Sequence, residues 1–417
     1  MDLQEQLAEL RRRMALASER AEAQAAQQAG HARELRAGAV TQLTGLTGGR
    51  EVATAKGAHL EVERWWAPLS RHGRIDIGAL IELPGDLYHA VSEGGARPAE
   101  PGAWAFLDTE TTGLAGGSGT CAFLIGVGRI TPQGFRLRQF FLRDFAEEPS
   151  VLEALSEELA GARTLVTYNG RAFDVPLLET RYRMNRARPP FGSLDHVDLL
   201  HGARRVWRLR LESCRLQQLE REIIGFEREG DIPGEQIPTA YFDFLRGQGA
   251  PWLAQVFEHN ALDIVTLACL SAVLPQRFRS PSPGALDHPE ELVAMGRWLR
   301  SGSRVEEALA LFREAAARGL RDELMPRTLW DVASIERKQK RWDAAVAVWS
   351  ELASFTNAFQ AAALTELAKH YEHREKNAAM ALEWAAQADA LRPDEETRKR
   401  VERLRRRARE PRTGRLL

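Results

Sequence analysis

Apolar and polar residues alternate in a way that predicts an α/β domain over residues 101–275. The runs WAFLDTE, CAFLIGVGRI and FRLRQFFLRDF predict three successive strands with turns between them. The amphipathic helix VLEALSEELAGA follows, then the strand TLVTYNG, the helix FDVPLLETRYRM and the short strand LDHVDLL. The pattern is then helical to about Leu274. Strands followed by alternating helices predict a mixed sheet flanked by helices.

Two segments precede this domain. Residues 1–36 read as a polar helix, in which Leu3, Leu7, Leu10 and Met14 repeat as in a coiled-coil seam. This helix could pack on its own body or form a weak dimer contact. Residues 37–100 carry Gly turns and the β-like runs HLEVERWW and IDIGALIEL, and they predict a small β-rich lead-in.

A repetitive helical region follows the α/β domain. Residues 276–288 have the composition of a linker. Within residues 289–395, the segments VEEALALFREAA, WDAAVAVWSELA and NAAMALEWAAQA align, with Phe312, Trp349 and Trp384 at equivalent places. Their spacings, 37 and 35 residues, predict an all-α domain of tetratricopeptide-like helix pairs. We expect such repeats to bind a protein partner or to brace the domain before them.

The last segment, residues 396–417, is a basic tail. From residue 398 onward it holds ten Lys/Arg against two Glu. It could bind nucleic acid non-specifically or be a solvated helix end, and the sequence favours neither interpretation.

Composition limits the function classes. The chain of 417 residues is long enough for two or three domains. Its net charge of −1 means that any affinity for nucleic acid must come from local patches. Three widely spaced cysteines form no disulfide framework, and neither a signal-peptide pattern nor a membrane-length apolar run occurs. These features predict a cytoplasmic protein without a membrane partner.

Carboxylates recur at three places in the α/β domain. Asp108 and Glu110 end the first strand, where residues i and i+2 share a face and could share a metal ion. Asp174 follows the strand that ends at Asn169, in the first turn of a helix. Either residue could instead serve that helix, Asn169 as a cap and Asp174 through the dipole.

The third place is a later helix with an otherwise apolar face. His259 and Asp263 stand four residues apart there, so their side chains lie on one side. They could be a base beside a metal ligand, or a surface contact. Hard divalent ions prefer oxygen ligands, and two such ions can cleave a phosphodiester with water.

Taken in order, LDTETTGL, YNGRAFD and HNALD resemble the three exonuclease motifs of the DEDD superfamily of ribonuclease-H-like 3′→5′ exonucleases. LAGGSGTCAFLIGVG, HVDLLHGARRVWRLRLESCRLQQLE and DIPGEQIPTAYFDFL extend the resemblance to the YprB-like branch, whose members often carry tetratricopeptide repeats. The resemblance covers residues 100–275 well.

The resemblance implies that Asp108, Glu110, Asp174 and Asp263 hold two divalent ions, Mg²⁺ or Mn²⁺. It also implies that His259 orients or deprotonates the attacking water. Family members with a catalytic His usually place it five residues before the last Asp, and those with a Tyr place it four before. Here a His stands at the Tyr spacing, which leaves the base unassigned.

Substrate contacts are expected beside the carboxylates and in a basic segment. Arg204, Arg205 and Arg208 could hold phosphates, and Trp207 among them could stack on an unpaired base. The alternative is a solvated helix face with Trp207 in the core. The expected substrate-binding set also includes Thr111 and Asn169. Asp198 could support a metal ligand or have a structural role.

The sequence therefore predicts a two-metal 3′→5′ exonuclease acting on single-stranded ends of DNA or RNA. Two alternatives stay open: an inactive scaffold that recruits partners through its repeats, and a structure-specific endonuclease. No residue in the sequence identifies a reader of the 2′-hydroxyl, so DNA and RNA are equally compatible with it.

Overall fold

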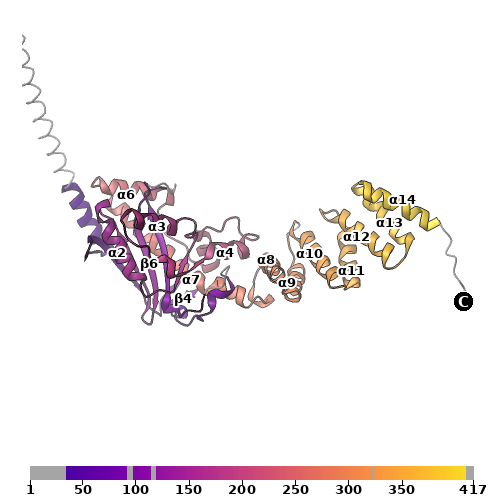
Figure 1. The fold of residues 1–417 in the computed structure, drawn as a ribbon, viewed down its shortest axis with the longest axis horizontal. Coiled ribbons are helices and arrows are strands. Elements are labelled where there is room, and N and C mark those ends of the chain that lie inside the picture. Colours follow the sequence, from indigo (N-terminus) through magenta and orange to yellow (C-terminus); the bar gives the residue numbers. More distant parts are fainter. Residues whose placement is uncertain (1–33, 92–96, 114–118, 322, 410–417) are drawn as a thin grey trace, which may run out of the picture. The chain divides into compact units, whose positions relative to one another are not determined.

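The computed structural model describes residues 34–91, 97–113, 119–321 and 323–409 (Figure 1). The expected helix over residues 1–36 and its leucine seam lie almost entirely outside these ranges, and residues 34–47 are helical. The described chain forms two compact units, one of residues up to 203 with 213–279, the other of 204–212 with residues from 280 onward.

The first unit is built on a seven-stranded mixed sheet, as the sequence predicts. The strand order is β1-β2-β7-β6-β5-β8-β9. Neighbours from β1 to β5 pair antiparallel, and β5, β8 and β9 pair parallel. The strands are β1 (Arg50–Thr54), β2 (Gly57–Trp66), β5 (Trp104–Thr111), β6 (Ala122–Thr131), β7 (Gly134–Phe141), β8 (Thr164–Thr167) and β9 (Asp195–Asp198).

Helices contact this sheet and close its core. Helix α2 (Glu148–Leu159) packs on β1, β2 and β7, and α7 (Ala250–Arg279) packs on β5, β6 and β7. The unit also contains the helix at residues 34–47, α3 (Asp174–Met184), α5 (Leu216–Leu219) and α6 (Ile237–Leu245), while α4 (Leu199–Trp207) runs from the first unit into the second. Buried aromatic rings fill the space, among them Phe123 stacked on Tyr241 at 4.1 Å between centroids.

The expected lead-in over residues 37–100 is not separate from the α/β domain. Strand β2 pairs with β7 from Leu60 opposite Phe141 to Trp66 opposite Phe135, so β1 and β2 extend the same sheet. The expected strand IDIGALIEL is also wrong for most of its length. Residues Ile77–Leu80 form a 3-10 helix, η1, in which the Ile81 N–H donates to the Gly78 carbonyl at 3.1 Å.

Helix α7 is long and apolar enough to cross a membrane, judged by length and composition alone. Most of its apolar window is buried inside the first unit, as is usual for a core helix. The helix runs to Arg279, so the first residues of the expected linker 276–288 are helical.

The second unit is all-helical. Each of its successive helices contacts the next one in sequence. Phe312 and Trp349 are buried and Trp384 is half-buried, at similar places in α9, α11 and α13. The helices are α8 (Pro289–Ser301), α9 (Val305–Arg318), α10 (Leu324–Lys338), α11 (Trp342–Ala353), α12 (Gln360–His373), α13 (Ala378–Leu391) and α14 (Glu395–Arg409).

Of the expected basic tail, residues 396–417, the structure describes residues 396–409, and these are helical. Helix α14 buries Val401 and Leu404 against its neighbours. The buried carboxylate of Glu372 pairs with Arg400, Arg403 and Arg407. These contacts fix one side of the basic helix to the helices that precede it.

Candidate metal centre

Asp108 and Glu110 lie in the second half of β5. Four buried residues of that strand, Trp104–Leu107, are followed by the half-buried Asp108–Thr111. The two carboxylates alternate along the strand and therefore share a face. The pairing with β6 shifts register between Glu110 and Thr111, which ends the regular ladder next to Glu110.

Asp174 is the first residue of α3 and meets β5 through Thr109. The Thr109 hydroxyl donates to Asp174 Oδ1 at 2.5 Å. Asn169 does not cap α3, since the residue before that helix is Phe173 and Asn169 has a positive φ of 67°.

Asp198 explains the shape of the loop before α3. Its carboxylate accepts hydrogen bonds from the backbone N–H groups of Asn169 at 2.8 Å and Arg171 at 3.1 Å. It also accepts from the N–H of Leu200 at 3.1 Å. These contacts favour the structural role for Asp198, which holds the loop that delivers Asp174.

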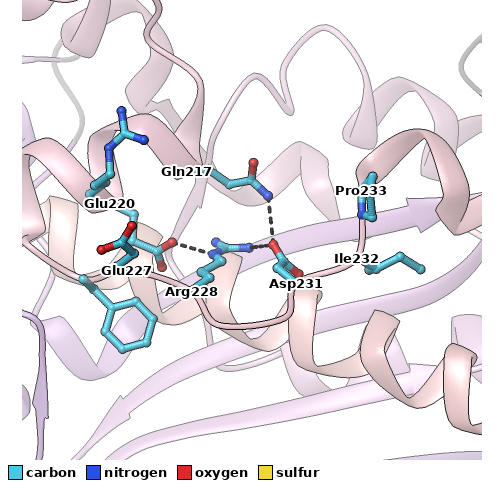
Figure 2. A pocket seen from close by; sticks show the side chains of 9 residues that line it. Gln217, Glu220, Glu227, Arg228, Asp231, Ile232 and Pro233 are labelled. Atoms are coloured by element: carbon cyan, nitrogen blue, oxygen red, sulfur yellow. Dashed lines mark hydrogen bonds and ion pairs between the residues drawn. The ribbon is translucent and has the colours of Figure 1, made fainter.

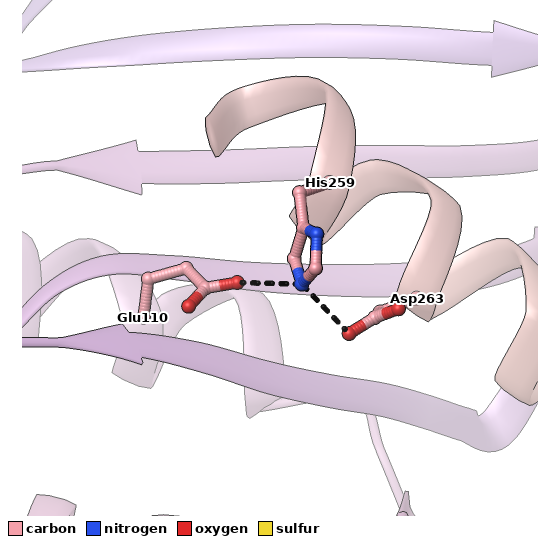
Figure 3. A group of neighbouring side chains, drawn as sticks. All are labelled: Glu110, His259 and Asp263. Carbon is pink, nitrogen blue, oxygen red and sulfur yellow. Dashed lines mark ion pairs between the residues drawn. The ribbon is translucent and has the colours of Figure 1, made fainter. Parts of the chain in front are cut away.

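Helix α7 brings His259 and Asp263 to the same place. Nε2 of His259 lies 3.6 Å from Asp263 Oδ2 and 3.9 Å from Glu110 Oε1 (Figure 3). One ligand atom from each of the three residues lies within 4.8 Å of the others. The His259–Asp263 pair is thus part of the carboxylate cluster rather than an isolated surface contact.

Three residues that the sequence did not single out complete the centre. Asn260 donates from Nδ2 to Asp108 Oδ2 at 2.9 Å. Asp231 contacts Nδ1 of His259 at 2.8 Å, and Arg228 pairs with Asp263. Asp231 opens the segment DIPGEQIPTAYFDFL, and Asn260 is part of HNALD, so both stand inside the quoted motifs. Their spacing alone carried no signal.

The negative charges of the clustered carboxylates repel one another when no cation lies between them. Burial, followed by the charges of Asp263 and Asp174, raises the pKa of Asp108 well above its usual range. Burial and the charge of Asp108 do the same for Glu110. Burial raises the pKa of Asp174 to about 6.

The pKa of His259 is raised, whereas burial alone would lower it. Burial lowers its pKa, but the hydrogen bond with Asp231 and the charge of Asp263 outweigh burial and raise the pKa above its usual value. The imidazole and the acidic groups therefore favour positive charge at this position.

The residues present fit divalent metal ions. Four carboxylates converge, and oxygen donors suit hard cations such as Mg²⁺. The raised pKa values of Asp108 and Glu110 reflect burial and repulsion by the neighbouring carboxylates, which a bound cation would offset. Asp108, Glu110, Asp174 and Asp263 are the residues that would hold it.

A cavity of about 540 Å³ adjoins this cluster. Asp108 and Asp174 line it together with the expected substrate-binding residues Thr111 and Asn169. Phe173, whose side chain is 57% exposed, also lines it and was missed at the sequence level. An exposed aromatic ring beside acidic residues is a feature that only the tertiary structure reveals.

The basic segment belongs to the second unit, whereas the carboxylates belong to the first. Trp207 is fully buried, so the expected stacking of this ring on a base is wrong and the core alternative holds. Arg204, Arg205 and Arg208 are exposed and belong to the second unit, in the segment Arg204–Glu212. Their contact with substrate stays a prediction.

Comparisons with known proteins bear on the fold of the first unit and on the family of the chain. Residues 105–274 match the family described as the RNase H superfamily. The chain is 33% identical over 329 residues to "Uncharacterized protein YprB" of Bacillus subtilis (strain 168), covering 77% of this chain and 78% of that protein. The chain belongs to the YprB family. The range 105–274, which matches the RNase H superfamily, contains all four carboxylates and His259.

One solved structure has a weaker likeness. It is the family B DNA polymerase from the hyperthermophilic archaeon Pyrobaculum calidifontis, with 16% identity and a TM-score of 0.31. The match covers 48% of this chain and 29% of the polymerase chain. A likeness of this size carries no argument about activity. The first unit is assigned to the ribonuclease-H-like fold because of the family match and the topology of its sheet.

Proposed function

We propose that this protein is a metal-dependent nuclease, a 3′→5′ exonuclease that acts on single-stranded ends of nucleic acid. The observation that carries the proposal is the convergence of β5, the start of α3 and α7 on one acidic cluster. Asp108, Glu110, Asp174 and Asp263 would hold two divalent ions, Mg²⁺ or Mn²⁺. When bound, such ions neutralise phosphate charge and activate water.

The chain's own residues supply the remaining chemistry. Nε2 of His259 faces Glu110 and Asp263, where it would orient the attacking water or accept its proton. The spacing of His259 from Asp263 is that of the Tyr-type motif, yet its side chain reaches the cluster. This position supports His259 as the candidate base.

The cavity beside Asp108 and Asp174 supports a single-stranded end as substrate. Phe173 offers a ring on which an unstacked base could lie, and Thr111 and Asn169 offer polar contacts. A base within a duplex could not reach that ring without unstacking. The DNA or RNA identity of the substrate is left to experiment.

The decisive assay compares matched DNA and RNA oligonucleotides, blocked at either end, with Mg²⁺ or Mn²⁺. Wild-type protein should release mononucleotides from an open 3′ end, and Asp108→Ala should abolish release. Asp76→Ala is the matched control, because the exposed Asp76 pairs with the exposed Arg71 at 2.8 Å.

The same assay separates the alternatives. Internal cutting of an end-blocked substrate would indicate an endonuclease. A wild-type rate equal to that of Asp108→Ala, with no binding of Mn²⁺ in calorimetry, would indicate an inactive scaffold. Either result would replace the exonuclease proposal.

The second unit suggests a role in binding. We propose that α8–α13 form tetratricopeptide-like pairs, because each helix contacts its sequence neighbours and the aligned aromatic residues recur in α9, α11 and α13. Such a surface would hold a protein partner or brace the nuclease unit.

A further inference from the structure

Four groups of the candidate metal centre are each held by a neighbouring polar side chain. Thr109 holds Asp174 and Asn260 holds Asp108. The other two contacts come from one segment, residues 225–233, which follows the π-helical turn η6 (Glu220–Ile224). In that segment Arg228 contacts Asp263, and Asp231 contacts His259.

Arg228 is the centre of a buried ionic network. Its guanidinium pairs with Glu220, Asp231 and Asp263 through three different nitrogen atoms. Figure 2 draws Arg228 between Glu220 and Asp231, with the amide of Gln217 donating to Asp231 at 3.0 Å. The side chain of Arg228 is 6% exposed and that of Glu220 is 1% exposed.

Such a network needs a reason beyond stability. A buried ion pair often contributes little compared with apolar residues of similar size, although losing one partner is costly. Glu220 is itself anchored, because it accepts from Thr266 and contacts His72. The network therefore fixes Arg228 firmly relative to α7, and Arg228 in turn fixes Asp263.

The second contact determines how the imidazole of His259 is presented. Asp231 accepts hydrogen bonds from Nη1 of Arg228 and from Nε2 of Gln217, both at 3.0 Å, and these donors favour its ionised carboxylate. An ionised carboxylate can only accept hydrogen bonds. Nδ1 of His259 must then carry the proton that it shares with Asp231, and Nε2 is the nitrogen that faces Glu110 and Asp263.

We propose that Arg228 and Asp231 are positioning residues of this centre: Asp231 selects the ring nitrogen of His259 that faces the carboxylates, and Arg228 fixes the carboxylate of Asp263. The catalytic consequence rests on the proposed nuclease function. The orientation of the imidazole does not, and it can be measured without substrate.

The first test reads the tautomer of His259 in wild-type protein. The chain has ten histidines, so ¹⁵N-histidine spectra of metal-free protein would be compared with those of His259→Gln to assign the ring. At a pH where the ring is neutral, we expect a protonated Nδ1 and a bare Nε2. A protonated Nε2 with a bare Nδ1 overturns the proposal for Asp231, whatever the variants do.

The second test uses Asp231→Asn, which keeps the size of the side chain but can donate to Nδ1. We expect a shift of the His259 tautomer towards a protonated Nε2 and a fall in kcat of about 10- to 100-fold with KM unchanged. Mn²⁺ binding in calorimetry should persist. Asp243→Asn, which changes a carboxylate paired with the exposed Arg246, is the control and should keep wild-type kcat.

The Arg228 contact has its own variant. Arg228→Lys keeps the charge but cannot span three carboxylates at once. We expect a lower kcat at unchanged KM and weaker Mn²⁺ binding, together with a folded circular-dichroism spectrum. Wild-type kcat and Mn²⁺ affinity in this variant would overturn the role of Arg228. If the variant does not fold, restored folding with inactive kinetics in Arg228→Gln supports it, and restored wild-type kinetics overturns it.

The two proposals fail in distinguishable ways. Suppose that wild-type protein does not cut nucleic acid, but that the Asp231→Asn substitution changes the tautomer of His259. The nuclease function is then wrong, and the positioning of the ring stands. If wild-type protein cuts but Asp231→Asn has wild-type kcat and tautomer, the positioning role is wrong and the nuclease function stands.

Discussion

The Nδ2 atom of Asn260 donates to Oδ2 of Asp108 across 2.9 Å, which joins the middle of α7 to the acidic end of β5. The same amide accepts from Nε2 of Gln139 at 2.9 Å through its oxygen. Asn260 is fully buried, so neither partner can be replaced by water without rearrangement.

Asn260→Ala is therefore expected to weaken both the fold and the metal centre. Leaving buried polar partners unsatisfied costs about 1–3 kcal/mol, which should appear in the free energy of unfolding from urea titration. Mn²⁺ affinity in calorimetry should fall as well, since Asp108 loses its support. Glu258→Gln, on the exposed side of α7, is the control. Unchanged stability and affinity in Asn260→Ala would contradict the expectation.

Gly126 of β6 sets how closely α7 approaches the sheet. A Cβ atom there would lie 2.2 Å from Cδ1 of Ile264 and 2.4 Å from Oδ1 of Asn260. We expect Gly126→Ala to lower the thermal midpoint and the nuclease rate together, because it pushes Asn260 away from Asp108. Gly192→Ala has open space and should change neither. A stable, fully active Gly126→Ala protein would show that the close approach is unnecessary.

Phe173 is expected to bind a base of the substrate. Phe173→Ala should raise KM for single-stranded oligonucleotides, with a loss of about 1–3 kcal/mol in binding, and leave kcat nearly unchanged. Phe355→Ala removes an exposed ring elsewhere, in the second unit, and serves as the control. Equal KM values for the two variants would remove Phe173 from the substrate site.

The pH dependence of metal-free stability follows from Asp174. Its pKa is raised from 3.8 to about 6, so the folded protein holds this proton more tightly than the unfolded chain does. The contribution of Asp174 to the free energy of unfolding is thus present at low pH and lost as pH rises from 3.8 through about 6.

Thermal midpoints in chelator isolate this effect as the difference between wild type and Asp174→Asn. With rising pH the wild type should lose stability relative to the variant, and added Mn²⁺ should reverse the trend. A difference that stays constant across this range would contradict the raised pKa.

The all-helical second unit should show a graded response to truncation of its aromatic residues. Trp349 is 2% exposed, whereas the equivalent Trp384 is only half-buried. Trp349→Ala should cost about 3–5 kcal/mol in the unfolding of the second unit, and Trp384→Ala should cost less. Chemical denaturation followed by tryptophan fluorescence and circular dichroism would measure both. Equal losses of unfolding free energy in the two variants would contradict the expectation that the more deeply buried Trp349 contributes more.

The local patterns in the sequence determined most of the fold and the acidic residues of the centre. Alternation with period two placed Asp108 and Glu110 on one face of β5, and period four placed His259 and Asp263 on one side of α7. These relations depend only on the geometry of a single element, so they can be read without knowing what the element packs against.

The tertiary structure decided what depends on contacts between distant segments. It buried Trp207, joined β1 and β2 to the main sheet, and brought Asp231 and Arg228 to His259 and Asp263 across 28 and 35 residues of chain. Residues so far apart meet only when the whole core has formed. Periodicity and the resemblance to the DEDD motifs could name the four carboxylates, but they could not name the side chains that hold them in place.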